Sequence, residues 1–332
     1  MSTSIRRILV AVKDLRGRAS PAIRKAAQLA RALDAKLDLF HAITDPLAVD
    51  ALALAGQDER KLEAATKTRY LKRLEALAAP LRRNGLQVTT AAEWDYPVHE
   101  AIVRRARHSQ ADLIVVEQHP GPHRVPRLLR YADWDLLRHS PVPVLLVKKR
   151  GKYTTPRVLA AVDPSHAFAK TARLDEAVLS AGEHFAAALR GKLHVVHAYI
   201  PTLLDMPTEL TDPEVSSKLF GHAHAEAVAR LEKTLRASRL GKLPRGRRHL
   251  VARHPVDAIP QAARDAACEV VVMGALSRSG VKGFFIGNTA ERLLDELPCD
   301  LLVVKQPGFA ARVQAKVRGP QFVSLLPSYG FA

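Results

Sequence analysis

The segment formed by residues 273–297 combines glycines with the start of an expected helix. Its four glycines are Gly274, Gly280, Gly283 and Gly287. Glycine lets the backbone approach a bulky ligand closely and adopt positive φ. Asn288 is expected to cap the helix that follows, with Glu291 as its capping-box partner. Amide N–H groups at a helix start are unsatisfied donors, so this arrangement favours an anion such as a nucleotide phosphate.

Other side chains of the segment support this interpretation. Ser277 and Asn288 offer neutral donors, whereas Arg278 and Lys282 add positive charge. The alternative is an ordinary surface loop in which Asn288 serves only as a helix cap.

The composition limits the classes of protein to consider. The chain has 332 residues and a formal net charge of +18, which attracts polyanions but says nothing about the fold. No apolar run approaches the roughly 20 residues of a membrane span, and no secretion signal is recognisable, so we expect a cytoplasmic protein. Cys268 and Cys299 begin apolar runs and are interpreted as small buried residues.

Apolar runs alternate with amphipathic segments in the first half of the chain. The expected strands are residues 8–12, 37–43, 112–117 and 142–147, and the expected helices are roughly 21–33, 57–84 and 97–108. Strands that are apolar throughout are typical of a parallel sheet covered on both faces by helices.

The same elements return after Pro156. The expected strands are residues 158–162, 193–199, 249–252, 270–274 and 300–305, with a long helix over 213–240 and another beginning at Pro255. ILVAV at Ile8 parallels VLAAV at Val158, and LDLFHAI at Leu37 parallels LHVVHAY at Leu193. The sequence therefore indicates an internal duplication, joined by a short basic linker over 148–156.

Five parallel strands in the order 3-2-1-4-5 form a doubly wound sheet, which binds ligands beyond the carboxyl ends of its first and fourth strands. In the second half these ends are Asp163 and Met273–Gly274, so the glycine segment begins at the expected ligand crevice.

These residues resemble a known family. Universal stress proteins carry, after the fourth strand, a glycine, two residues, a glycine, nine residues, and then Gly-Ser or Gly-Thr, and they bind ATP with this pattern. Gly274 and Gly287 match the first and third glycines, whereas Ser277 replaces the second and Asn288 the hydroxyl residue. The segments FFIGNTAERLLDELPCDLLVVK and DWDLLRHSPVPVLLVK extend the resemblance over nearly the whole chain, as a tandem member.

The resemblance implies an α/β fold of two tandem doubly wound five-stranded domains, of the adenine nucleotide alpha hydrolase-like type, packed as an internal pseudo-dimer. Asp163 would contact the ribose or adenine, Ala198 would edge the base and Met273 would pack on it. The phosphates would be surrounded by Gly274, Ser277, Arg278, Gly287, Asn288 and Thr289. The implied ligand is ATP, ADP or AMP, with or without Mg²⁺.

The first half lacks the pattern. Aligning the halves places Glu117 opposite Gly274, Arg130 opposite Gly287 and Tyr131 opposite Asn288. Lys13 stands opposite Asp163, although Asp14 is adjacent. An acidic side chain next to a triphosphate would repel it, so we expect one nucleotide site, in the second half. The basic loop over 119–134 of the first half suits an acidic or amphiphilic ligand, unless its Trp134 and Leu137 belong to the core.

Other chemistry finds less support. His222 and His224 lie two apart on an expected helix and do not share a face, so no metal site is predicted. No nucleophile or carboxylate pair has a recognisable setting, so no catalytic residue is assigned and at most weak ATPase activity is expected. The basic cluster over 241–250 lacks interleaved aromatic residues, which argues against specific nucleic-acid binding.

The sequence thus predicts domains over 1–150 and 156–308 and a C-terminal tail over 309–332. The predicted function is that of a cytoplasmic stress-response protein that binds adenine nucleotide in its second domain, with a homodimer of the tandem chain as a further hypothesis. The alternative is a nucleotide-free scaffold whose basic surface or first domain binds an acidic ligand or partner.

Overall fold

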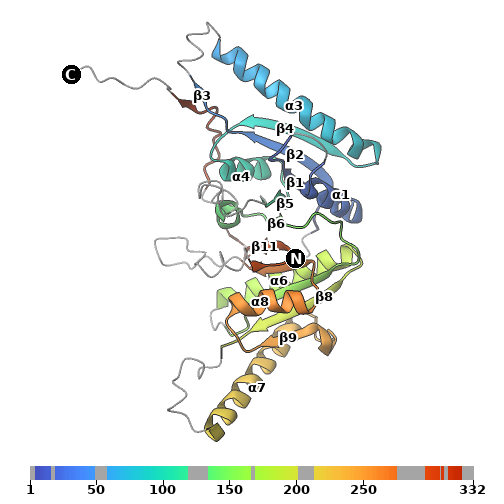
Figure 1. The fold of residues 1–332 in the computed structure, drawn as a ribbon, viewed down its shortest axis with the longest axis vertical. Coiled ribbons are helices and arrows are strands. Elements are labelled where there is room, and N and C mark those ends of the chain that lie inside the picture. The colour runs from blue at the N-terminus through green and yellow to red at the C-terminus, as the bar shows by residue number, and fades with distance from the viewer. Residues whose placement is uncertain are drawn as a thin grey trace, which may run out of the picture. The chain divides into compact units, whose positions relative to one another are not determined.

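The computed structural model describes residues 4–15, 19–48, 58–118, 134–165, 169–200, 213–274, 296–306, 308–309 and 313–323. The chain forms two compact units (Figure 1). The first combines Thr3–Val144 with the C-terminal Ala310–Ala332, and the second is Leu145–Phe309. The C-terminal segment therefore belongs to the first unit, a placement that the sequence did not predict.

Helices and strands alternate along the first unit. The elements are β1 (Arg7–Ala11), α1 (Pro21–Leu33), β2 (Lys36–Ile43), β3 (Leu47–Ala48), α3 (Glu59–Arg83), β4 (Val88–Trp94), α4 (Val98–His108) and β5 (Leu113–Glu117). A short helix covers residues 134–139, and β6 (Val144–Val147) begins in this unit and continues into the second. The strand order β4-β2-β1-β5 is parallel throughout.

The second unit repeats this order. Its elements are β7 (Arg157–Val162), α6 (Ala169–Ala188), β8 (Lys192–Ala198), α7 (Pro213–Ala237), the 3-10 turn η3 (Arg245–Arg247), β9 (Arg248–Val251), α8 (Pro255–Asp265), β10 (Val270–Gly274) and β11 (Asp300–Val304). Its parallel strand order is β9-β8-β7-β10-β11. In sequence order this is 3-2-1-4-5, which confirms the expected doubly wound sheet.

Local sequence explains where α1 begins and ends. Ser20 is the N-cap and its hydroxyl accepts from the Ile23 N–H, while Pro21 opens the helix. Asp34 ends the helix with φ 53°, in the left-handed region, and its N–H donates to Ala30. β2 starts two residues later, so this turn sets the register of the first two strands.

The central strands are buried on both faces. In β1, Ile8, Leu9 and Val10 are fully buried, and in β7 Val158 and Leu159 are too. This burial confirms the interpretation of the apolar runs as strands covered by helices on both sides.

Strand β4 and helix α6 escaped prediction, as did the two-residue strands. β4 has the sequence VTTAAEW, which is neither continuously apolar nor strictly alternating. The helix α6 has its apolar residues spread around much of its circumference and so gives a weak periodic signal.

Helix α4 is joined to the sheet through a buried ion pair. The Asp38 carboxylate of β2 is fully buried and accepts from Arg105 Nε at 2.8 Å and from a second guanidinium nitrogen at 3.0 Å. Thr89 of β4 donates its hydroxyl to the same carboxylate at 3.0 Å. A buried carboxylate that lost this partner would be strongly destabilising.

A second buried pair receives the C-terminal segment. Arg104 donates to both carboxylate oxygens of Asp95, at 2.6 and 2.8 Å. The same guanidinium donates to the Gln314 carbonyl at 3.3 Å, and the Arg318 N–H donates to Asp95 at 3.1 Å. Beyond it, β12 (Phe322–Val323) forms a parallel ladder with β3. Residues 313–323 thus form a strap across the first unit, between α4 and β3.

The linker is fixed to the second unit by a carboxylate. Asp300, at the start of β11, is fully buried and accepts from the backbone N–H groups of Lys148 and Lys149 at 2.8 and 2.9 Å. The Tyr153 hydroxyl donates to it at 2.5 Å, and burial raises the pKa of this hydroxyl well above its usual value. The residues after β6 are therefore held rigidly against the sheet of the second unit.

We expect Arg105→Ala to lower the free energy of unfolding by about 3–5 kcal/mol, because it leaves the Asp38 carboxylate buried without its cation. Chemical denaturation measures the change. The matched control is Arg236→Ala, which removes an exposed ion pair with Glu232 and should change stability by less than about 1 kcal/mol. Equal losses in the two variants would contradict the role given to the buried pair.

Candidate functional site

The candidate site of the second unit lies at the carboxyl end of its sheet, where β7 stands between β8 and β10. Four predicted residues are at this edge: Asp163 follows β7, Ala198 ends β8, and Met273 and Gly274 end β10. The other predicted residues are Ser277, Arg278, Gly287, Asn288 and Thr289, and all of them lie outside the described residues.

The strand registers of the two units correspond residue by residue. Ala11 pairs with Val116 in the first unit, and their counterparts Ala161 and Met273 pair in the second. Glu117 and Gly274 each follow directly, at the carboxyl end of the fourth strand. The alignment of the halves made from the sequence is therefore confirmed at this edge.

Asp163 is held by its own turn. Its N–H donates to the buried Asp175 carboxylate of α6 at 3.0 Å. Its Oδ1 accepts from the Ser165 N–H at 3.3 Å and also from the Ser165 hydroxyl. The Asp163 side chain is half-buried, and these hydrogen bonds hold it at the crevice. There its carboxylate could accept a hydrogen bond from a hydroxyl group of a ligand.

His197 and Tyr199 flank Ala198, and both were absent from the predicted site. His197 is fully buried, and neither ring nitrogen has a hydrogen-bond partner among the described residues. Burial lowers its pKa, whereas the neighbouring Asp163 carboxylate and the nearby Val162 carbonyl, short of hydrogen-bond geometry, raise it. The Tyr199 hydroxyl hydrogen-bonds His224 Nδ1 at 2.8 Å. One sequence signal points to His197: it stands in the run LHVVHAY at the place where LDLFHAI of the first half has His41.

Gly274 has a packing reason to be glycine. A Cβ at this position would lie 2.5 Å from both Cγ and Cδ2 of Leu174, a buried residue of α6. The backbone of β10 therefore passes directly under the helix at the strand end, and the absence of a side chain here does not depend on a ligand.

The same edge of the first unit has different chemistry. Lys13 and Glu117 stand where the second unit has Asp163 and Gly274, and both are half-buried. His41 donates from Nδ1 to the Val12 carbonyl at 2.7 Å, and its ring lies 4.7 Å from that of Tyr70. The loop over 119–133 lies outside the described residues. Leu137 is buried and Trp134 is half-buried, so the core alternative is met by Leu137 and only in part by Trp134.

The described residues show neither a metal-holding cluster nor a membrane-spanning helix. They contain no group of three or more His, Cys, Asp or Glu side chains arranged to hold a metal ion. None of their helices is both long and apolar enough to cross a membrane. Cys268 and Cys299 are buried free thiols, and burial raises the pKa of each to about 12, which keeps them protonated and unreactive.

The duplicated sheet and its strand-end crevice define the class of protein. The model of the universal stress protein family matches residues 4–148 and again residues 155–305, and the chain belongs to this family, with two of its domains in tandem. The resemblance found in the sequence is thereby confirmed.

Similar proteins match nearly the whole length of this chain. Universal stress protein E of Photorhabdus laumondii is 26% identical over 310 residues, covering 89% of this chain and 93% of the relative. Universal stress protein E of Escherichia coli is 26% identical over 302 residues, covering 89% and 92%. A crystal structure of a functionally unknown protein from Pseudomonas aeruginosa PAO1 is 25% identical, with a TM-score of 0.68 over 92% of this chain and 94% of that one.

We expect Gly274→Ala to lower the free energy of unfolding by about 1–3 kcal/mol, because the new methyl group overlaps Leu174. Combining it with Leu174→Ala should give a smaller loss than the sum of the single variants. Gly221→Ala is the control, since nothing lies within 4 Å of its Cβ position on α7, and it should stabilise by about 0.5–1 kcal/mol. Thermal and chemical unfolding give the stability of the four variants relative to the wild type. If the losses caused by Gly274→Ala and Leu174→Ala add up fully in the double variant, the proposed overlap is refuted.

Proposed function

We propose that the chain is a cytoplasmic stress-response protein that binds ATP, or the related ADP or AMP, in its second unit and not in its first. The observation that carries the proposal is the difference between two strand ends of identical register. Gly274 and Asp163 occupy the positions that hold Glu117 and Lys13 in the first unit.

The chemistry of the two edges supports this asymmetry. An aspartate fixed by Ser165 can accept hydrogen bonds from ribose hydroxyl groups, which are neutral donors. After Gly274 the chain continues into the glycine segment, whose expected helix start favours phosphate. In the first unit, a carboxylate at Glu117 would repel the same phosphates at short range.

The proposed site includes the predicted residues on both sides of the crevice. Asp163, Ala198 and Met273 would contact the nucleoside, and Ser277, Arg278, Gly287, Asn288 and Thr289 the phosphates, with or without Mg²⁺. His197 is fully buried next to Asp163, and burial lowers its pKa. Its ring would therefore support the site as part of the packing beside Asp163. No group at the described edge is placed as a general base for water, so binding rather than turnover is the proposed activity.

Calorimetric titration tests the proposal. The full chain is unfolded, freed of copurified nucleotide and refolded, and then titrated with ATP, ADP and AMP. We expect one saturable site per chain, which is lost in Gly287→Arg, the change that copies Arg130 of the first half. Gly221→Arg is the control, since this glycine faces open space on α7 and the variant should bind as the wild type does.

Two results would overturn the proposal in different directions. If neither the wild type nor the control binds nucleotide, the chain is better described as a scaffold whose basic surface recruits an acidic partner. If two sites are found, Glu117 and Lys13 do not exclude nucleotide and the first unit is also a binding domain.

A further inference from the structure

The opposite, amino-terminal edge of each sheet carries a repeated pair of cations. In the first unit Arg7 begins β1 and Lys36 begins β2, and the two residues are register partners. In the second unit Arg157 begins β7 and Lys192 begins β8, again as register partners. Both units thus have the same like-charged pair at the same place, although neighbouring like charges repel each other.

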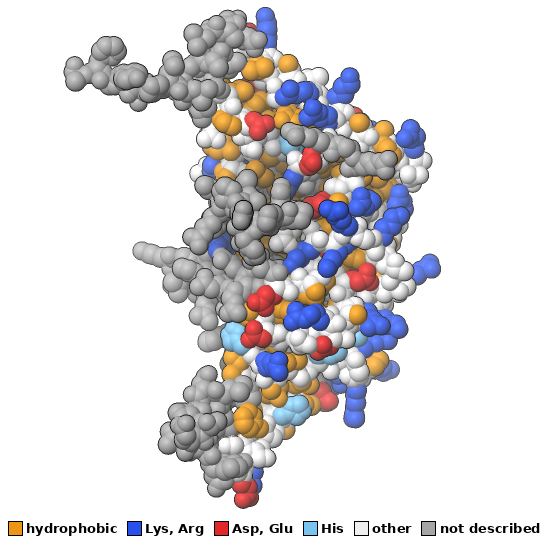
Figure 2. Space-filling model, viewed as in Figure 1, with side chains coloured by type: hydrophobic (Ala, Val, Ile, Leu, Met, Phe, Trp, Pro, Cys, Tyr) orange, Lys and Arg blue, Asp and Glu red, His pale blue; other side chains and the backbone are white. Residues whose placement is uncertain are grey.

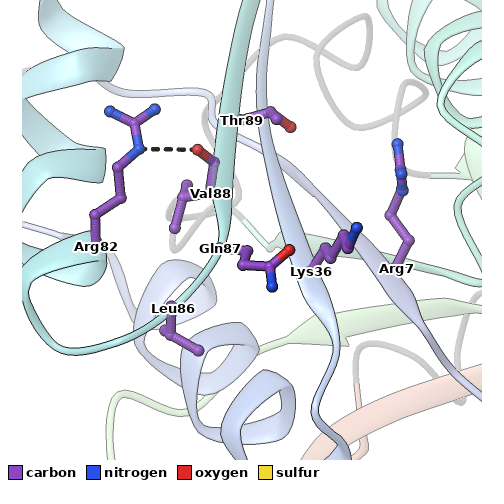
Figure 3. A pocket seen from close by; sticks show the side chains of 7 residues that line it. All are labelled: Arg7, Lys36, Arg82, Leu86, Gln87, Val88 and Thr89. Atoms are coloured by element: carbon purple, nitrogen blue, oxygen red, sulfur yellow. Dashed lines mark hydrogen bonds between the residues drawn. The ribbon is translucent and has the colours of Figure 1, made fainter.

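The first unit surrounds its pair with further donors. Arg7 and Lys36 line an open pocket of about 500 Å³ together with Gln87 and Thr89 (Figure 3). Arg82 also lines it, but its guanidinium is held by the Val88 carbonyl at 2.9 Å and by Glu75. The Thr89 hydroxyl is likewise already donated to Asp38. The pocket thus offers one ammonium, one guanidinium and the Gln87 amide, a donor set that suits phosphate oxygens.

In the second unit, positive side chains lie near a stacked pair of histidines. His194 of β8 stacks on His249 of β9, with ring centroids 5.4 Å apart and Nδ1 3.1 Å from the facing Nε2. Burial lowers the pKa of His194 to about 4, and its neighbours lower it further; they are His249, Arg247, Arg157 and Lys192.

Two acidic groups near this edge already accept hydrogen bonds from the protein. Asp112 accepts from the backbone N–H groups of Arg6 and Arg7, at 2.8 and 3.0 Å. In the second unit Asp265 accepts from the Gln261 amide at 2.7 Å, and Arg157 itself donates to the Ala266 carbonyl at 2.9 Å. Lys36 and Lys192 both remain exposed at the strand starts.

We propose that each unit binds a compact phosphate anion, such as a diphosphate, at the amino end of its first two strands, through Arg7 and Lys36 in the first unit and Arg157 and Lys192 in the second. These sites lie at the end of each sheet opposite to the proposed nucleotide site and do not depend on it. A compact anion is favoured over nucleic acid because no aromatic residue lines the first pocket.

A competing physical explanation makes a different prediction. Helices that precede these strands end at the same edge, α1 at Leu33 and α6 at Ala188, and cations near helix carboxyl ends are stabilising. If the lysines served only this purpose, Lys36→Gln and Lys192→Gln would destabilise the chain in the absence of any anion. If they form anion sites, the same changes relieve repulsion, so unfolding temperature should stay equal or rise.

The test titrates pyrophosphate into the full chain carrying Gly287→Arg, so that the proposed nucleotide site is blocked. We expect two sites per chain. Lys36→Gln and Lys192→Gln should each weaken one site by roughly tenfold or more, the effect of losing a charge-assisted hydrogen bond. Lys61→Gln near the start of α3 and Lys218→Gln near the start of α7 are the matched controls, both exposed lysines, and should bind as the parent does.

Thermal unfolding gives a second readout. Pyrophosphate should raise the unfolding temperature of the parent more than that of the double variant Lys36→Gln, Lys192→Gln. The proposal is overturned if pyrophosphate does not saturate, if the double variant binds it like the parent, or if that variant is less stable without anion. It is also overturned if single-stranded oligonucleotide saturates and depends on these lysines while pyrophosphate does not.

Discussion

The central strands of this protein are buried on both faces, and that constraint determines where chemistry can occur. Their backbone donors and acceptors are used by neighbouring strands, and their side chains are enclosed by helices. Only the strand ends reach solvent. Each unit therefore has two edges where chemistry can occur, one at the carboxyl ends and one at the amino ends of its strands. The proposed nucleotide site lies at the carboxyl edge of the second unit, and an Arg–Lys pair stands at the amino edge of both units.

The two units have the same residues at one edge of the sheet and different residues at the other. At the amino end, the same Arg–Lys pair stands in both units. At the carboxyl end, Glu117 replaces a glycine and Lys13 an aspartate, within registers that otherwise correspond. The basic residues are widely spread over the surface in view (Figure 2), so net charge alone would not have distinguished this pair from its surroundings.

The parts of the fold that could be predicted are those that depend on local sequence patterns. Continuous apolar runs located most strands, and Pro21 and Pro255 marked helix starts that the structure confirms. The strand VTTAAEW escaped because its small and polar residues follow neither period. The four site residues at the strand ends could be placed because strand ends follow from the repeat.

Interactions between residues far apart in the chain leave no pattern in the sequence from which they could be predicted. Arg104 and Gln314 are far apart in the sequence, and nothing around either residue indicates the other. The sequence match with His41 does not reveal that the His197 ring is fully buried without a hydrogen-bond partner among the described residues, because this depends on the tertiary packing around β8. Gly274 was predicted for its freedom near a ligand, whereas the structure adds the contact with Leu174 that no local pattern contains.

The strap over 313–323 has a consequence for synthesis on the ribosome. The first unit is made of two pieces of chain, and its second piece follows the whole of the other unit. Until these last residues emerge, Asp95 lacks the Arg318 N–H and β3 lacks its only described ladder partner. Domains generally fold in the order in which they are translated. Here the unit that begins translation first is the last to be completed.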